Sequence, residues 1–151
     1  EPVCQIDLLA TFADLLGYQL PDDQGEDSFS ILPVIKFEDY SKPLRGPIIH
    51  HSCAGYFAIR EGRWKLNMIK GSGGSLSPSY EEPEPGELPY ELYDMNQYYR
   101  ETKDVSDKHP EVVNHLESKI TDIVKKGRST SGVPQKNDGS QWWSQLTWIE
   151  K

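Results

Sequence analysis

The sequence predicts an α+β fold in which an antiparallel sheet of three to four strands packs against a C-terminal helix. Two observations lead to this expectation. Apolar and polar side chains alternate on both sides of a glycine-containing turn within residues 56–68, a pattern that predicts a β-hairpin. Apolar side chains then recur at helical spacing after Pro110, and Gly127 follows the last of them, a pattern that predicts a long amphipathic helix.

The hairpin is expected to turn at Glu61-Gly62, because glycine adopts a positive φ without steric cost. A turn at this place would set Ile59 opposite Trp64 and Phe57 opposite Leu66. All four apolar side chains would then share one buried face of the sheet, since side chains alternate along a strand. We therefore expect Trp64 to be a large core residue.

A further strand is expected over residues 89–94, after a connection at 71–88 that is rich in Gly, Pro and Glu. The GSGGS sequence in this connection invites comparison with phosphate-binding loops, whose glycine-rich backbones cradle anions. It lacks the G-K-[ST] ending and the strand-to-helix context of those loops. An inter-strand loop is therefore the expected structure.

The C-terminal helix is expected over residues 108–126, with His109 at the N-cap and Pro110 at the first helical position, where its missing N–H costs nothing. Gly127 would end the helix. His115 lies off the apolar stripe and is expected to be solvated. The stripe that should cover one face of the sheet consists of Val112, Val113, Leu116, Ile120, Ile123 and Val124.

An N-terminal helix is expected over residues 5–16, with Gly17 after its end. Apolar residues cover most of its circumference, which predicts burial on several sides. Asp7, Thr11 and Asp14 form a narrow polar stripe at helical spacing. This stripe is read as a solvated face rather than as a carboxylate site.

Two segments carry weaker patterns. Residues 18–46 are expected to form an irregular connector, in which Ser28 caps a short turn that ends at Ile35. Residues 128–151 form an extended C-terminal tail that is rich in tryptophan. The tail either packs along its own domain, which we favour, or offers its indole rings as a carbohydrate-stacking platform. The three rings belong to Trp142, Trp143 and Trp148.

Composition limits the classes of partner. A chain of 151 residues with 36% hydrophobic residues suits one domain with a single core. Its net charge of −8 argues against nucleic acid, whose phosphates attract clusters of Lys and Arg, and against an anionic membrane surface. No apolar run is long enough to cross a bilayer. A disulfide between Cys4 and Cys53 is possible, but two free buried thiols are the favoured interpretation.

The hairpin and its flanks resemble the C-terminal region of the type I sulfatases, the arylsulfatase-like members of the alkaline-phosphatase-like superfamily. The phrases FAIR, WKL and LYD carry the resemblance, together with a helix like the family's DLLPT…LAG, a turn like its G-x-S-x-x-P-x-L, and an ending like its D-P-x-E-x-x-N-L…P-E. Tyr98-Tyr99 stand where the family has Asp-Pro, and Asp104 where it has Asn; both differences change a turn. The matching segments lie at residues 6–17, 27–35, 57–60, 64–66, 92–94 and 101–127.

The resemblance implies a division of the chain and a function for a longer parent enzyme. Residues 1–46 would be the end of the family's N-terminal α/β domain and a connector, so that the first helix is inherited from that domain. In the full enzyme this helix would pack against that domain, and in this chain alone one of its apolar sides would lack a partner. Residues 47–127 would be the C-terminal sulfatase subdomain, and residues 128–151 the tail. The parent would hydrolyse sulfate esters of carbohydrates or aryl sulfates, with the N-terminal sulfatase domain as partner. A secreted, periplasmic or lysosomal location is expected.

The chemical groups that the family uses are missing from this chain. Sulfatases of this kind make a formylglycine from Cys or Ser within a C-x-P-S-R-like motif, and neither Cys4 nor Cys53 lies in such a motif. No Asp-rich metal cluster occurs at family spacing either. We therefore expect no catalytic residue and no metal ligand here, with formylglycine and calcium in the parent enzyme. The alternative function is a non-catalytic glycan-binding module that uses the tryptophan-rich tail.

His50 and His51 are the candidate substrate-binding residues. A histidine at a strand end can donate a hydrogen bond to a sulfate or sugar oxygen, or transfer a proton near neutral pH. Alternation along the strand would send the two rings to opposite faces, so that only one would easily face a given cleft. His51 is the preferred candidate. The alternative is that both rings are structural and bind backbone groups.

Overall fold

The computed structural model describes residues 2–136, 139–140 and 143–149. The chain divides into two compact units, the first formed by residues 1–48 and 123–137 and the second by residues 49–122 and 138–151.

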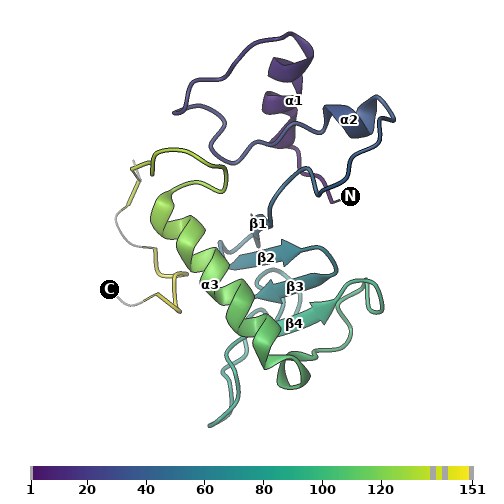
Figure 1. The fold of residues 1–151 in the computed structure, drawn as a ribbon. Helices are drawn as coiled ribbons and strands as arrows, with labels where there is room; N and C mark the ends of the chain where they lie inside the picture. The colour runs from purple at the N-terminus through teal and green to yellow at the C-terminus, as the bar shows by residue number, and fades with distance from the viewer. Residues whose placement is uncertain (1, 137–138, 141–142, 150–151) are drawn as a thin grey trace. The chain divides into compact units, whose positions relative to one another are not determined.

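The second unit contains the predicted sheet. The strands β1 (Ile48–His51), β2 (Phe57–Glu61), β3 (Trp64–Asn67) and β4 (Glu91–Asp94) follow one another across the sheet in chain order (Figure 1). The pairings of β2 with β3 and of β3 with β4 are antiparallel. With the helices described below, this sheet confirms the predicted α+β class.

The hairpin has a different register from the predicted one. Ile59 pairs with Leu66, and Glu61 pairs with Trp64. The two turn residues are therefore Gly62, which has a φ of +56°, and Arg63. The prediction that Ile59 lies opposite Trp64 is wrong by two residues. Because side chains alternate with a period of two, a shift of two leaves every apolar side chain on its predicted face.

The helix α3 (Pro110–Lys126) lies across one face of the sheet in the second unit (Figure 1). Tyr90 donates a hydrogen bond to Glu117 of the helix at 3.1 Å, and Glu61 at the end of β2 accepts hydrogen bonds from His115 and Lys119. Burial would raise the pKa of Glu61, but these hydrogen bonds hold it below its ordinary value. The fully buried core side chains include Ile59, Leu66, Leu92, Val113, Leu116 and Ile120.

The structure tests the predictions made for two side chains near this interface. His115 is 55% exposed, as expected, although it binds Glu61. Trp64 is only half-buried: its ring centroid lies 4.8 Å from that of His109, and the Arg63 guanidinium carbon lies 5.0 Å from its own ring centroid. The prediction that Trp64 is a core residue opposite Ile59 is therefore wrong.

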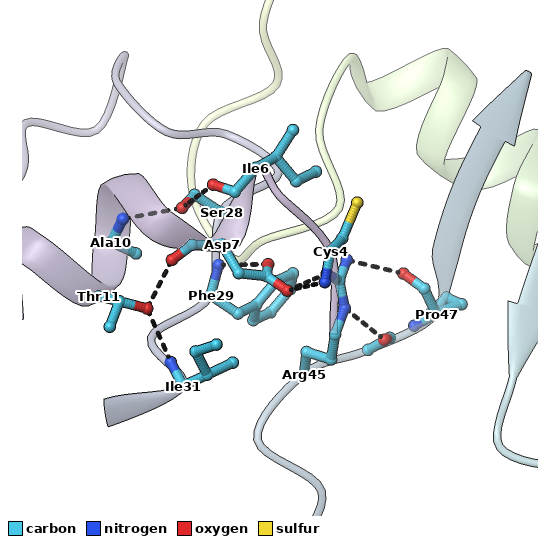
Figure 2. Close-up of polar contacts among 11 residues, drawn as sticks. Cys4, Ile6, Asp7, Ala10, Thr11, Ser28, Phe29, Ile31, Arg45 and Pro47 are labelled. Carbon is cyan, nitrogen blue, oxygen red and sulfur yellow. Dashed lines mark hydrogen bonds and ion pairs between the residues drawn. The ribbon is translucent and has the colours of Figure 1, made fainter. Parts of the chain in front are cut away.

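The first unit contains α1 (Asp7–Leu15) and α2 (Leu32–Ile35). The Asp7 carboxylate is fully buried and accepts hydrogen bonds from the backbone N–H groups of Cys4 at 2.8 Å and Phe29 at 3.2 Å (Figure 2). It also forms an ion pair with Arg45 at 2.5 Å, and both charged side chains are buried. The carboxylate therefore joins three separate segments of the unit.

The rest of the polar side of α1 is buried in the same way. The Thr11 hydroxyl donates to the Asp7 carbonyl oxygen and accepts from the Ile31 N–H at 3.0 Å (Figure 2). The Ser28 hydroxyl binds the backbone of α1 and does not cap α2, which begins after Ile31 without a side-chain cap. The prediction of a solvated polar stripe is thus wrong for Asp7 and Thr11, because these groups supply partners for buried backbone groups.

The apolar side of α1 is exposed. Phe12 is 55% and Leu16 80% exposed, so the helix is not buried on several sides within this chain, and one apolar side lacks a partner, as the family resemblance implies. An amphipathic helix normally turns its apolar side inward, and α1 does the reverse within this chain. The six exposed side chains, named here the α1 stripe, are Ile6, Leu8, Leu9, Phe12, Leu15 and Leu16.

The chain after α3 returns to the first unit and then to the second. Arg128 is buried and pairs with Asp22 at 3.1 Å, and the Thr130 hydroxyl donates to the Glu26 carbonyl oxygen at 2.7 Å.

Cys4 and Cys53 are free, as favoured, but Cys53 is exposed rather than buried. No helix in the described part of the chain has both the length and the apolar character needed to span a membrane.

Candidate functional site

The candidate site is a cavity of about 450 Å³ in the second unit, on the sheet face opposite α3. Alternation along the strands builds its floor, because residues next to the buried ones point to the other face. Lys65 pairs with Tyr93, and Asn67 pairs with both Ala58 and Glu91. All five line the cavity. The floor of the cavity is therefore mostly polar, whereas the opposite face of the sheet is mostly apolar. We name this space the sheet-face cavity.

The glycine-rich connection forms one wall. Gly71, Ser72 and Gly73 line the cavity, and the Gly71 N–H donates to the Glu91 carboxylate at 3.3 Å. Gly73 has a φ of +61°, and a Cβ there would lie 2.9 Å from the Ser52 side chain. Any larger residue at this position would force the two segments apart. The segment that resembles a phosphate-binding loop thus serves as a close-packed wall.

Charged side chains from the loop after β4 form another wall. The Glu101 carboxylate binds the Lys65 ammonium group at 2.6 Å. Glu101 has a φ of +55°, a conformation that non-glycine residues rarely adopt and that tends to occur at functional sites. Arg100 also lines the cavity, and its guanidinium carbon lies 5.5 Å from the Tyr99 ring centroid. Among the described residues, Arg100 forms no ion pair.

Burial keeps several groups of the cavity in their neutral forms. Burial and the nearby Lys65 charge lower the pKa of His50. Burial raises the pKa of Glu91, and burial together with Glu91 raises that of Tyr93. At neutral pH, His50 and Tyr93 are therefore uncharged hydrogen-bonding groups beside the cationic Lys65 and Arg100. Such a set can bind sugar hydroxyls and an anionic substituent.

Both candidate histidines contribute to the wall of the cavity. Their neighbours still differ, as alternation requires: the pKa of His50 responds to Lys65 and Glu101 on the floor side. The ring of His51 instead packs edge-on against Phe57, with 4.1 Å between ring centroids. His51 Nδ1 lies 3.2 Å from the Gly55 carbonyl oxygen.

The sequence interpretation missed the residues of the cavity floor and the loop after β4. Lys65 and Tyr93 were not named as site residues. The signal was present, since the same alternation that buries Leu66 and Leu92 directs Lys65 and Tyr93 to the other face. Arg100 and Glu101 gave no comparable signal, because no periodicity places a loop. In the described ranges, no group of three or more His, Cys, Asp or Glu side chains is arranged to hold a metal ion.

The tryptophan-rich tail packs on the second unit where it is described. Trp148 Nε1 donates to the Thr121 hydroxyl at 3.0 Å, and its ring centroid lies 5.2 Å from that of Phe57. Trp143 is 43% exposed and lies beside His51 and Phe57. Trp142 lies outside the described residues.

Comparisons with known proteins find sulfatases among the proteins that this chain resembles. No protein-family model matches the chain. Over 122 residues, or 80% of its length, the chain is 33% identical to an N-acetylgalactosamine-6-O-sulfatase of Bacteroides thetaiotaomicron, of which it spans 23%. The chain is a homologue of the sulfatases. It spans about a quarter of the length of the relatives that it matches.

Solved structures support the same fold. A structure from work on the metabolism of multiple glycosaminoglycans by Bacteroides thetaiotaomicron matches 79% of the chain and 24% of its own, with 28% identity and a TM-score of 0.62. A 2-O GAG sulfatase matches 78% of the chain and 24% of its own, with 20% identity and a TM-score of 0.55. At that identity the second match shows the fold alone. The α+β architecture of this chain is thus one found in sulfatases.

Proposed function

We propose that this chain is the C-terminal part of a longer sulfatase that hydrolyses sulfate esters of carbohydrates. The observation that carries the proposal is the 33% identity with an N-acetylgalactosamine-6-O-sulfatase over 80% of the chain. The preceding part of the protein would supply the formylglycine and the calcium ion that the family resemblance implies. This chain would supply structural support and one wall of the substrate cleft.

The sheet-face cavity is the proposed contact with the sugar. Its size suits a sugar ring with its substituents, and its floor offers neutral donors and acceptors at fixed positions. Glu101 compensates the charge of Lys65, but Arg100 adds positive charge without an ion pair among the described residues, in a chain whose net charge is −8. Local cations of this kind are what an anionic sulfated substrate needs when the protein as a whole repels it.

The α1 stripe is a second observation that supports the proposal of a longer sulfatase. Its six large apolar side chains lie on one side of a helix whose polar side is already used inside the first unit. Contiguous exposed apolar surface of this kind marks a protein–protein contact. We propose that the stripe packs against the preceding part of the same sulfatase, the N-terminal sulfatase domain.

Phe12→Asp should affect the full-length sulfatase and the 151-residue chain differently. In the full-length sulfatase the substitution should cost at least about 3 kcal/mol, because it removes a buried phenyl ring and buries a carboxylate without a partner. Thermal unfolding and soluble yield would measure this loss. In the 151-residue chain the same change should leave the free energy of unfolding nearly unchanged. Val133→Asp, at another exposed apolar position, is the control, and a full-length Phe12→Asp enzyme as stable as this control would refute the proposed contact.

The role of His51 is tested in the full-length enzyme. If His51 contacts the substrate in the transition state, His51→Ala should lower kcat/KM by at least about tenfold, or roughly 1.4 kcal/mol. His115→Ala is the matched control, because His115 is more than half exposed and does not line the cavity. Full activity in both variants would make His51 structural. A loss in His50→Ala alone would keep the site and move the contact to His50.

The alternative, a glycan-binding module that uses the tryptophan-rich tail, has weaker support. Trp148 is fixed by its bond to Thr121 and by its contact with Phe57, so its ring is used within the unit. Only Trp143 is described with a largely exposed ring. Glycan titration with tryptophan quenching that is lost in Trp142→Ala, by the chain alone, would favour the module.

A further inference from the structure

The tail segment 143–148 returns to the turn that follows β1. Its far end is anchored by Trp148, whose indole N–H donates to Thr121 of α3 and whose ring meets the edge of Phe57. Its near end, Trp143, lies 6.0 Å from the His51 ring centroid. Two aromatic contacts thus bracket residues 144–147, which include Gln145.

Gln145 holds the turn at Ala54 and Gly55 directly. Its side-chain amide donates a hydrogen bond to the Ala54 carbonyl oxygen at 3.0 Å. The other end of the amide accepts a hydrogen bond from the Ser144 hydroxyl at 3.0 Å, which sets the orientation of the amide. Gly55 has a φ of +85°, and a Cβ at that position would lie 3.6 Å from the Gln145 amide. The turn is therefore in contact with the tail on the Gln145 side.

The same turn determines the state of the His51 ring. His51 Nδ1 lies 3.2 Å from the Gly55 carbonyl oxygen. A carbonyl oxygen only accepts hydrogen bonds, so this contact requires the proton on Nδ1. In the neutral ring Nε2 is then an acceptor, suited to a sugar hydroxyl. Only a protonated His51 could also donate from Nε2, for example to a sulfate oxygen.

We propose that Gln145 is a positioning residue for His51. By holding the Ala54–Gly55 turn in place, the Gln145 amide keeps the Gly55 carbonyl oxygen against His51 Nδ1. This contact fixes the tautomer and the orientation of the ring of His51, a residue that lines the sheet-face cavity. The functional consequence rests on the proposed function, in which His51 contacts a hydroxyl of the sulfated sugar. The tautomer itself does not.

The first test is a long-range proton–nitrogen NMR spectrum of the histidine rings in the chain at about pH 8, where an ordinary histidine is neutral. Wild-type His51 should show the Nδ1–H tautomer. Gln145→Ala and the near-isosteric Gln145→Glu, which cannot donate to Ala54, should both shift His51 toward the Nε2–H form. The His109 and His115 signals should stay in place, which shows that the fold is retained. Gln24→Ala, at an exposed glutamine of the first unit, should change nothing.

The second test is a double-mutant cycle on kcat/KM in the full-length sulfatase. Gln145→Ala should lower kcat/KM by about threefold or more, and should have no further effect in the His51→Ala background. An unchanged His51 tautomer in Gln145→Ala would overturn the inference. An equal loss in both backgrounds would also overturn it, because Gln145 would then act without His51. A shifted tautomer with unchanged kcat/KM would uphold the positioning and count against the proposed sugar contact.

Discussion

Asp7→Ala should lower the free energy of unfolding of the first unit by about 3–5 kcal/mol. The substitution leaves the Arg45 guanidinium buried without its carboxylate and removes the acceptor of the Cys4 and Phe29 N–H groups. Removing one member of a buried ion pair costs this much because the remaining charge is then buried with neither hydrating water nor an oppositely charged partner. Chemical denaturation followed by far-UV circular dichroism would measure the loss.

Two further variants make the Asp7 test specific. Asp14→Ala changes a carboxylate on the same helix that is exposed, and it should cost less than about 1 kcal/mol. Adding Arg45→Met to Asp7→Ala should recover part of the lost stability, because it removes the unpaired buried charge. If Asp7→Ala is no more harmful than Asp14→Ala, the carboxylate does not hold the unit together.

Leu66→Ala should lower the free energy of unfolding of the second unit by about 2–5 kcal/mol, the usual cost of a cavity left by a fully buried leucine. Trp64→Ala should cost less, although tryptophan is larger, because Trp64 is half-buried and lies opposite Glu61 rather than Ile59. Thermal unfolding of both variants would give the order. A larger loss for Trp64→Ala would restore the register first expected from the sequence.

The hairpin shows how far alternation alone can predict structure. The period of two fixes which side chains share a face, and this part of the prediction holds for Phe57, Ile59, Leu66 and Trp64. It cannot fix the pairing, because registers that differ by two residues put the same side chains on the same faces. The turn decides between them. Glycine at the first turn position, Gly62, selects the pairing that is observed.

The polar stripe of α1 was misread for a related reason. Helical periodicity places Asp7 and Thr11 on one side and the apolar residues on another, but it does not say which side faces the rest of the chain. Here Arg45 and the backbone of residues 28–31 bury the polar side. These partners are distant in the sequence, and no local sequence pattern predicts them.

The candidate site was predicted in part. The two histidines were named from their place at a strand end, and both line the cavity. Lys65 and Tyr93 could have been named by extending the alternation to the second sheet face. Arg100, Glu101 and Gln145 could not, because their places depend on loop and tail conformations that periodicity does not describe.

We propose that this chain supports a sulfatase and shapes its substrate cleft, while the chemistry resides in the preceding part of the protein. Hydrolysis of an aryl sulfate with added calcium tests it directly, with the full-length enzyme and the 151-residue chain assayed in parallel. We expect turnover by the full-length enzyme and none above the blank for the chain alone. Turnover by the pure chain that is abolished by a substitution within it, such as His51→Ala, would show that the chain carries catalytic groups of its own.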